Sequence, residues 1–218
     1  MKTWRLIPLQ TDNAFMNMAI DEAILISRIK DAVPNTIRFY QWKPSAVSVG
    51  KNQKILEQIY PDALKKYQVD AVRRTSGGGA VYHDHRGEIT YSITALKKDI
   101  AMDFTSVYVK IYSAIIDALR LLGIPADFVE GDIKNCPNLT VNGKKISGSA
   151  QTIKREIIQQ HGTLLVSVDL EKMFELLRIG NLDCKLAFKI GKKKITSIQN
   201  ELRHDIKINT VENALKQG

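Results

Sequence analysis

The most informative part of the chain is Arg73-Arg74-Thr75-Ser76-Gly77-Gly78-Gly79-Ala80-Val81-Tyr82-His83-Asp84, where three consecutive glycines separate a basic pair from a strand-like segment. Glycine adopts positive φ angles without steric cost and lets the backbone approach a ligand closely. The N–H groups of such a loop can bind an anion, and the two arginines can add bidentate contacts to a phosphate or carboxylate. Three glycines are also typical of a simple tight turn. Taken alone, the glycines favour the tight turn. The stretch matches neither the Walker nor the dinucleotide fingerprint, so it is not a standard nucleotide loop.

Two further stretches carry candidate chemistry. The first is Val141-Asn142-Gly143-Lys144-Lys145-Ile146-Ser147-Gly148-Ser149-Ala150-Gln151. Its Asn-Gly pair predicts a two-residue hairpin turn, which places Lys145 at the start of the returning strand beside small residues. A lysine next to such a space can reach a phosphate as a point charge, and the alternative is an exposed hairpin lysine. The second is Gln160-His161-Gly162-Thr163-Leu164-Leu165-Val166, whose histidine, taken alone, is more typical of a packed core position than of catalysis.

Hydrophobic periodicity predicts an α+β domain on a mixed or antiparallel sheet. Apolar residues at helical spacing predict a helix from Met16 to Ile29, and alternation from Glu88 to Thr94 predicts a half-buried strand. The other expected strands lie at 36–42, 46–49, 126–129, 139–141, 145–149 and 162–168. The other expected helices are one capped by Thr105 or Ser106 and ending near Gly123, one from Leu170 to Leu177, and a last one that opens with a capping box of Asn209 and Glu212. No linker or repeat interrupts the sequence, so we expect residues 1–218 to form a single domain.

Composition narrows the class of protein. Of the 218 residues 44% are hydrophobic and 25% charged, which is typical of a globular protein, and no apolar run approaches the roughly 18 residues that span a bilayer. The expected location is cytoplasmic, without a membrane partner. Two cysteines are too few for a disulfide framework and lack zinc-ligand spacing, so no metal ligand is predicted. The net charge of +9 fits nucleic acid, a phosphate-bearing ligand or an acidic protein, and the lysine run 192–194 is expected to be a solvated turn.

Together the three stretches resemble the lipoate–protein ligase family, within the biotin/lipoate ligase and octanoyltransferase superfamily. Asn17-Met18-Ala19-Ile20-Asp21-Glu22 and Ile37-Arg38-Phe39-Tyr40-Gln41-Trp42 also look like the family's opening helix and first strand. The resemblance implies a class II aminoacyl-synthetase-like fold, with a large mixed sheet flanked by helices and a smaller sheet. It implies ATP- and Mg²⁺-dependent activation of lipoate to lipoyl-AMP, then transfer to a lysine of lipoyl carrier domains, such as those of 2-oxoacid dehydrogenase complexes or glycine-cleavage H-type proteins.

The resemblance also assigns the site residues of this lipoate–protein ligase reading. Lys145 is expected to be catalytic, as a charge partner for the activated carboxyl group. The residues expected to bind substrate or cofactor are Arg73, Ser76, Gly77, Gly78, Gly79, Ala80, His83, Asn138, Ser149, Ala150, His161, Gly162 and Thr163. Two departures affect this interpretation. Pro137 and Asn138 stand where many ligases have Asn-Asp, which affects magnesium or adenylate contacts, and the sequence lacks the accessory domain of many ligases, so we expect a separate accessory subunit.

Two alternatives remain open. The first is octanoyl or lipoyl transfer through a cysteine thioester without ATP, which needs a thiolate beside a cation. Cys136 lies nine residues before Lys145, but one sister family places its nucleophile about fifteen residues before that lysine, where this chain has Glu130. Cys184 follows the His-Gly strand, as in another sister family, but without that family's Pro-Cys-Gly. We expect both cysteines to be bystanders. The second alternative, a nucleic-acid-binding relative without catalysis, lacks a helix-turn-helix or RNA-binding signature.

Overall fold

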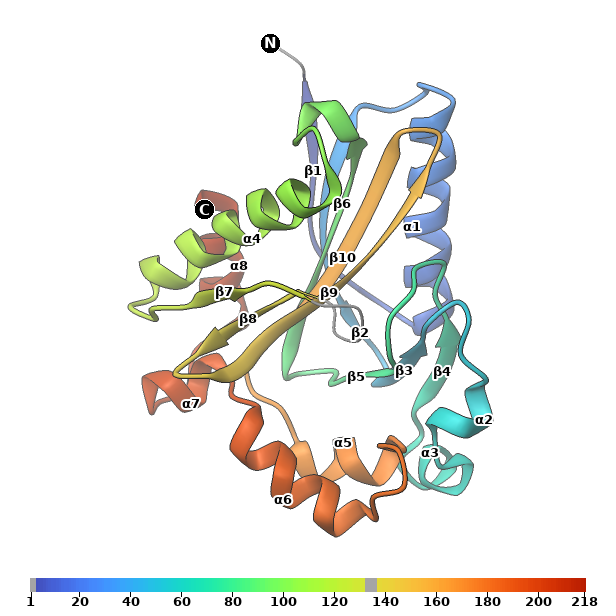
Figure 1. Cartoon of the computed structure of the whole chain (residues 1–218), viewed down its shortest axis with the longest axis vertical. Helices are drawn as coiled ribbons and strands as arrows, with labels where there is room; N and C mark the ends of the chain where they lie inside the picture. The colour runs from blue at the N-terminus through green and yellow to red at the C-terminus, as the bar shows by residue number, and fades with distance from the viewer. Residues whose placement is uncertain (1–2, 132–136) are drawn as a thin grey trace.

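The computed structural model describes residues 3–131 and 137–218, and a seven-stranded sheet forms its centre (Figure 1). The strand order is β1-β2-β6-β10-β9-β8-β7, and a three-stranded sheet with the order β4-β3-β5 lies beside it. The large sheet consists of β1 (Trp4–Asp12), β2 (Asn35–Trp42), β6 (Glu88–Leu96), β10 (Ile157–Leu165), β9 (Lys144–Lys154), β8 (Asn138–Val141) and β7 (Asp127–Val129). The small sheet consists of β4 (Asp70–Arg73), β3 (Ala46–Val49) and β5 (Val81–His83). The pairs β1/β2 and β3/β4 are parallel and the others antiparallel, which confirms the predicted α+β class with two mixed sheets.

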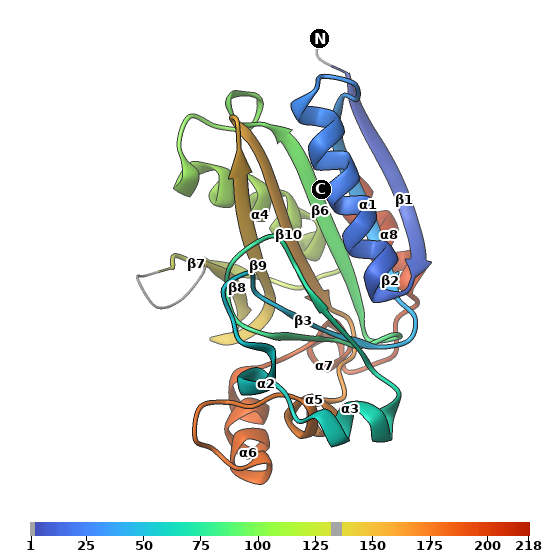
Figure 2. The same ribbon diagram turned by 90° about the vertical axis from the view of Figure 1, so that its right-hand side faces the viewer.

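Helices cover both faces of the large sheet and one end of the molecule. Helix α1 contacts β2, β6 and β10, whereas α4 and α8 pack together on the opposite face (Figures 1 and 2). The helices are α1 (Ala14–Ile29), α2 (Ile55–Gln58), α3 (Pro61–Tyr67), the 3₁₀ helix η1 (Lys97–Asp99), α4 (Phe104–Leu121), α5 (Leu170–Leu176), α6 (Cys184–Lys194), α7 (Ile198–Leu202) and α8 (Ile208–Gln217). Within the described residues, none of these helices combines the length and the apolar character that a bilayer crossing requires.

Strand β6 shows why the prediction of a half-buried strand was wrong. Ile89, Tyr91 and Ile93 alternate as expected and belong to the main core with the apolar face of α4. The polar alternate residues are buried as well, because α1 covers the other face; they are Thr90, Ser92 and Thr94, each 2% exposed. Hydroxyl groups on that face are tolerated because they find hydrogen-bond partners, such as Gln159 Nε2, which donates to Thr94.

A buried polar layer joins α1 to the sheet. The guanidinium of Arg38 is fully buried and lies 3.0 Å from the Asp21 carboxylate, and it also donates to the Asn17 side chain at 2.6 Å. The Tyr40 hydroxyl donates to the second Asp21 oxygen at 3.0 Å. Burial, followed by the Asp21 charge, raises the pKa of Tyr40 well above its usual value and keeps this phenol protonated. Each carboxylate oxygen therefore has a donor, which offsets the cost of burying the charge.

The predicted hairpin turn is confirmed, whereas the two predicted helix caps were wrong. The Asn142-Gly143 turn is confirmed, with φ angles of 51° and 73° that suit a two-residue hairpin. The cap of α4 is Asp103, whose side chain accepts from Ser106 N, so the prediction of Thr105 or Ser106 was wrong by two or three residues. The capping box of the last helix was also wrong: α8 begins at Ile208, so Asn209 lies inside the helix, and Lys207 precedes it without a side-chain cap. Glu212 instead accepts from Leu9 N in β1 at 3.0 Å.

Candidate active site

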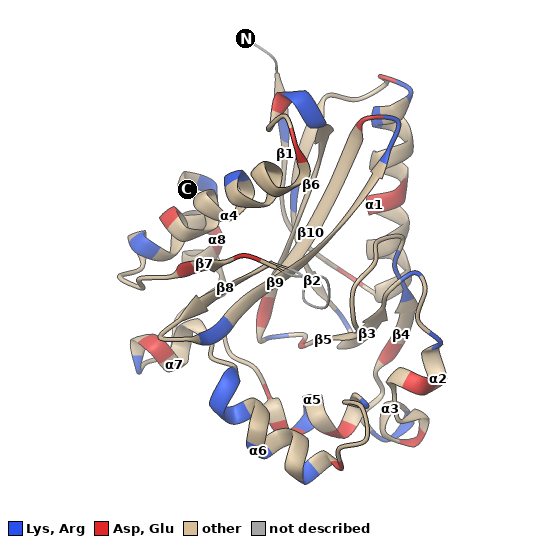
Figure 3. Ribbon diagram, in the orientation of Figure 1, with Lys and Arg blue, Asp and Glu red and all other residues tan. Residues whose placement is uncertain are grey.

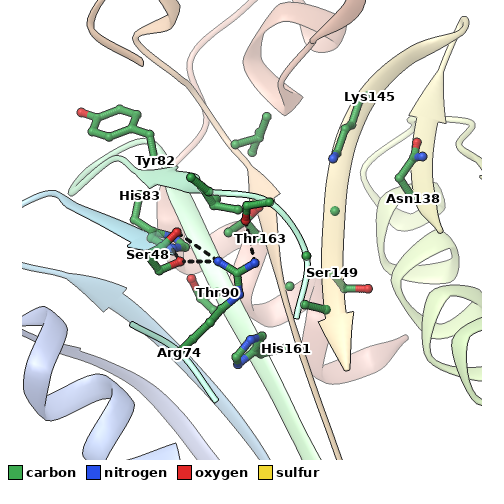
Figure 4. Close-up of a pocket in the computed structure, with 18 of the residues that line it drawn as sticks. Ser48, Arg74, Tyr82, His83, Thr90, Asn138, Lys145, Ser149, His161 and Thr163 are labelled. Carbon is green, nitrogen blue, oxygen red and sulfur yellow. Dashed lines mark hydrogen bonds between the residues drawn. The ribbon is translucent and has the colours of Figure 1, made fainter. Parts of the chain in front are cut away.

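A cavity of about 890 Å³ lies where the large sheet, the small sheet and α5 meet. Strands β9 and β10 supply one wall and the glycine loop after β4 supplies another. Figure 4 shows Lys145 and Asn138 on one side of this space and Arg74, Ser48 and His83 on the other. Much of the remaining lining is apolar, as an acyl chain would require; this part comprises Met18, Trp42, Val81, Val129, Leu165, Met173, Phe174, Leu177, Ile179 and Ile195.

Lys145 reaches the cavity because the hairpin turn and a glycine place it there. It is the second residue of β9, directly after the Asn142-Gly143 turn, and its carbonyl accepts from Thr196 N at 2.9 Å. Its side chain lies over Gly148: a Cβ at this position would stand 2.6 Å from both Cε and Nζ of Lys145. Only a residue without a side chain leaves room for the lysine in this pose. Lys145 is exposed overall, as the alternative predicted, and its side chain also borders the cavity.

Arg74 holds the glycine loop in shape. Its guanidinium donates to the carbonyl oxygens of Gly77 (2.7 Å) and Gly79 (2.6 Å) and to that of Ser48 on β3 (3.0 Å). Gly78 has a φ of 84°, the left-handed region that favours glycine. Gly50 must also be glycine, because a Cβ there would lie 2.1 Å from the Gly78 carbonyl oxygen. Three carbonyls on one planar fork fix the loop against β3 and β5.

His161 links the loop to the buried layer under α1. Its Nε2 lies 2.7 Å from the Ser76 hydroxyl, and its Nδ1 lies 3.6 Å from the Asp21 carboxylate, which is held by Arg38. Ser76 and His161 are both buried. The pair therefore connects the base of the glycine loop with β10 and α1.

His83 belongs to a second buried network on the small sheet. Its Nδ1 lies 2.8 Å from Glu88 Oε1, and its Nε2 lies 2.8 Å from the Ser48 hydroxyl. Thr90 donates to the same Glu88 oxygen, and Trp42 stacks on the histidine ring at 4.0 Å. This network joins β3, β5 and β6, and it fixes the wall of the cavity opposite Lys145.

Ser149 is placed by a third chain of hydrogen bonds. Its hydroxyl lies 2.8 Å from that of Tyr112, which donates to the Pro137 carbonyl at 3.0 Å, and Gln160 Nε2 donates to Ser149 at 3.3 Å. Nearby, burial raises the pKa of Tyr91 to about 12. Burial also raises the pKa of Tyr112, so both phenols stay protonated at neutral pH. Tyr112 therefore positions Ser149 and Pro137 at the cavity without carrying charge.

Comparison with known proteins agrees with this geometry. The family model of the lipoyl protein ligase A/B catalytic domain matches residues 13–218. Octanoyltransferase LipM of Anoxybacillus flavithermus is 34% identical over all of this chain and 85% of its own length, and that of Clostridioides difficile is 34% identical over all of this chain and 86% of its own. The chain belongs to the lipoyl protein ligase A/B catalytic domain family.

Two solved structures of this family resemble the chain over its whole length. A lipoate-protein ligase A bound with ATP matches with a TM-score of 0.84 and 27% identity, covering 83% of that chain. The bipartite lipoate protein ligase of Thermoplasma acidophilum, solved in a study that includes its lipoyl domain, matches with 0.82 and 27%, covering 82% of that chain. These similarities confirm the expected family and its fold.

Most of the site residues predicted from the family resemblance come together around the cavity. The predicted residues in its lining are Lys145, Gly78, Gly79, Ala80, His83, Asn138, Ser149, Ala150, His161, Gly162 and Thr163. Three others are placed differently. Arg73 is exposed and donates to the carbonyls of residues 50, 51 and 53, so Arg74 is the arginine that borders the cavity. Ser76 and Gly77 are absent from the cavity lining: Ser76 is buried against His161, and the exposed Gly77 contacts Arg74 through its carbonyl.

Of the two cysteines, Cys184 is among the described residues. Cys184 begins α6 and interacts with Tyr60, whose pKa is raised by burial and then by this neighbour. It is absent from the cavity lining and lies about 16 Å along the helix from Ile195, which borders Lys145. Cys136 lies outside the described residues. Glu130 borders the cavity, and the described residues include no cluster of three His, Cys, Asp or Glu side chains that could hold a metal ion.

Proposed function

We propose that this chain transfers an octanoyl or lipoyl group from an acyl thioester to the ε-amino group of a lysine on a lipoyl carrier domain. The observation that carries the proposal is the pose of Lys145, whose ammonium lies over Gly148 at the edge of a largely apolar cavity of about 890 Å³. The curated relatives that cover the whole chain are octanoyltransferases, which supports a thioester donor. This was the alternative of the sequence analysis, and the relatives fit it better than the ATP-dependent ligase.

The site suits the chemistry of acyl transfer. When a nucleophile attacks the acyl carbonyl, negative charge develops on its oxygen, and a preorganised ammonium such as Lys145 stabilises that charge. Overall, the C–S bond of the donor breaks, an amide C–N bond forms, and the amine proton passes to the leaving thiolate. The apolar lining holds the acyl chain and limits the access of water, which would otherwise hydrolyse the activated acyl group.

A two-step route through the protein needs a cysteine. The sequence holds two, and Cys184 lies away from Lys145 and outside the cavity lining. If a covalent acyl-enzyme forms, Cys136 is the thiol to test. The acyl group would then move from the donor thiol to this thiol and from there to the carrier lysine, with one thiol released at each step.

ATP-dependent ligation of lipoate remains a second candidate because of two specific observations. Glu130 stands where a sister family has its nucleophilic cysteine, and a 27% identical structure over the whole chain contains ATP. Lys145 and the glycine-loop N–H groups would suit a phosphate group. A magnesium ion would rely on nucleotide phosphates and Glu130, because the described residues offer no three-ligand cluster of their own. Bound ATP would supply the leaving group that activates the carboxylate.

One experiment separates the two candidates. A purified lipoyl carrier domain is incubated with the enzyme and either an octanoyl thioester of an acyl carrier without ATP, or free octanoate or lipoate with ATP and magnesium. Acylation from the thioester is the expected result, and acylation that requires ATP would establish the ligase. In the thioester reaction, Cys184→Ser should retain activity and serves as the control for Cys136→Ser. A hydroxylamine-labile adduct that Cys136→Ser abolishes would assign the nucleophile.

A further inference from the structure

Helix α6 carries an unusual concentration of positive charge. Its sequence Cys-Lys-Leu-Ala-Phe-Lys-Ile-Gly-Lys-Lys-Lys contains five lysines and no acidic residue. The other long helices α1, α4 and α8 each have one basic residue in the last turn, which is enough to complement a helix C-terminus, whereas α6 has three. Lys192, Lys193 and Lys194 are all exposed, so this surplus faces solvent rather than an internal carboxylate.

This basic turn lies next to the candidate active site. The residue after it, Ile195, pairs with Lys145 and borders the cavity, and Thr196 N donates to the Lys145 carbonyl. Lys144, the exposed first residue of β9, precedes Lys145 and adds a fourth positive charge beside this turn. Figure 3 shows basic residues both at this end of α6 and at the neighbouring start of β9. We call Lys144, Lys192, Lys193 and Lys194 the basic rim.

We propose that the basic rim docks a carrier domain through an acidic surface beside its acceptor lysine. The inference rests on the proposed function, since it identifies where the acceptor of that reaction binds. An acceptor amine can reach the acyl carbonyl at Lys145 only if the carrier backbone comes within one lysine side chain of the cavity. A carrier at that distance meets the end of α6.

The composition of the rim matches such a partner. Lysine side chains are flexible and strongly hydrated, so they attract an acidic surface over a long range without demanding a fixed geometry. Leu186 and Ile190, which are 43% and 36% exposed on the same helix, offer apolar area beside the charges. Two acidic groups of the described residues near α6 are engaged elsewhere: Glu201 accepts from Thr196, and Asp183 caps the far end of α6.

The test reverses the charge of the three lysines in the last turn of α6. We compare Lys192→Glu/Lys193→Glu/Lys194→Glu with a control of equal charge change, Lys30→Glu/Lys98→Glu/Lys110→Glu. The control lysines are exposed and lie after α1, in η1 and on α4, away from α6 (Figure 1). Two reactions are followed at low and high salt: acylation of the carrier domain, and acyl transfer from the same donor to lysine methyl ester, a small amine that needs no docking, with the uncatalysed rate subtracted.

We expect the α6 variant to lose about 10- to 100-fold in kcat/KM for the carrier at low salt, with a smaller loss at high salt. Its enzyme-dependent transfer to lysine methyl ester should stay within about twofold of wild type, and the control variant should change the carrier reaction by less than about threefold. Equal effects of the two variants on the carrier would overturn the proposal. So would a raised KM for the acyl donor with an unchanged KM for the carrier. Absence of transfer by the wild type to either amine would instead refute the proposed function itself.

Discussion

A methyl group at Gly148 tests the pose of Lys145 without removing the lysine. The added Cβ of Gly148→Ala would stand 2.6 Å from Cε and Nζ of Lys145, whereas ordinary contacts between such atoms are about 3.5 Å. The ammonium must therefore move by about 1 Å, and a displacement of this size at a catalytic group costs on the order of 100-fold. Because the obstructed atoms are the end of a flexible side chain, the fold should remain intact and Tm should change by less than about 3 °C.

The assay is a double-mutant cycle on kcat for carrier acylation. We expect Gly148→Ala to lower kcat by about 10- to 100-fold and Lys145→Ala to lower it by about 100-fold or more, as for the loss of a group that stabilises an oxyanion. In the Lys145→Ala background, Gly148→Ala should have almost no further effect, since the lysine that it displaces is gone. If Gly148→Ala lowers both backgrounds by the same factor, or leaves the wild-type rate within about twofold, the reasoning about Lys145 is refuted.

Three other variants test the glycine loop beside the site and the attachment of α8 to β1. Gly50→Ala places a Cβ 2.1 Å from the Gly78 carbonyl oxygen, so it should displace the glycine loop and raise the KM for the acyl donor by about tenfold or more, and an unchanged KM would contradict the packing of the loop. In Arg74→Lys the lysine cannot hold three carbonyls on one planar fork, so donor binding should weaken and Tm should fall. The matched change Arg73→Lys, at an exposed side chain, should have a smaller effect in the same two measurements. Burial would raise the pKa of Glu212, but hydrogen bonds from Lys216 and Leu9 N outweigh burial and lower this pKa. The carboxylate therefore stabilises the fold above its unfolded pKa of about 4.3, and this contribution is lost as the pH falls through the folded pKa. Glu212→Gln should therefore destabilise by about 1–2 kcal/mol at pH 7 and by less at pH 3 in urea unfolding, and an effect independent of pH would contradict the lowered pKa.

Local signals in the sequence predicted those parts of the fold that depend on few residues. The Asn142-Gly143 turn follows from the positive φ angles that these two residues accept, and it is enough to place Lys145 at the start of β9. The alternation of β6 was also correct as a period. Its polar face was predicted to be exposed because no local signal shows that α1 lies over it, 59 residues or more earlier in the chain.

Parts of the site depend on contacts between distant segments and were therefore missed. Arg73 and Arg74 are equivalent as neighbours in the sequence, and the structure separates them because β4 ends between them: Arg73 remains exposed, while Arg74 turns under the glycine loop toward Ser48. The Asp21 and Arg38 pair behind His161 had a weak signal, since Asp21 is a charged residue on the face of α1 that carries Ile24 and Leu25. The cavity-lining side chains of α5 follow from its packing below β5 and could not be derived from its periodicity.

The most direct measurement of the central claim is acylation of a lipoyl carrier domain from an octanoyl thioester without ATP, followed by intact-protein mass spectrometry with the wild-type chain and with Lys145→Ala. Lysine-specific octanoylation by the wild type that falls by about 100-fold or more in the variant is the predicted result. Octanoylation that is equally fast with Lys145→Ala, or a carrier that stays unmodified until ATP and the free acid are added, would contradict the proposed acyl transfer at Lys145.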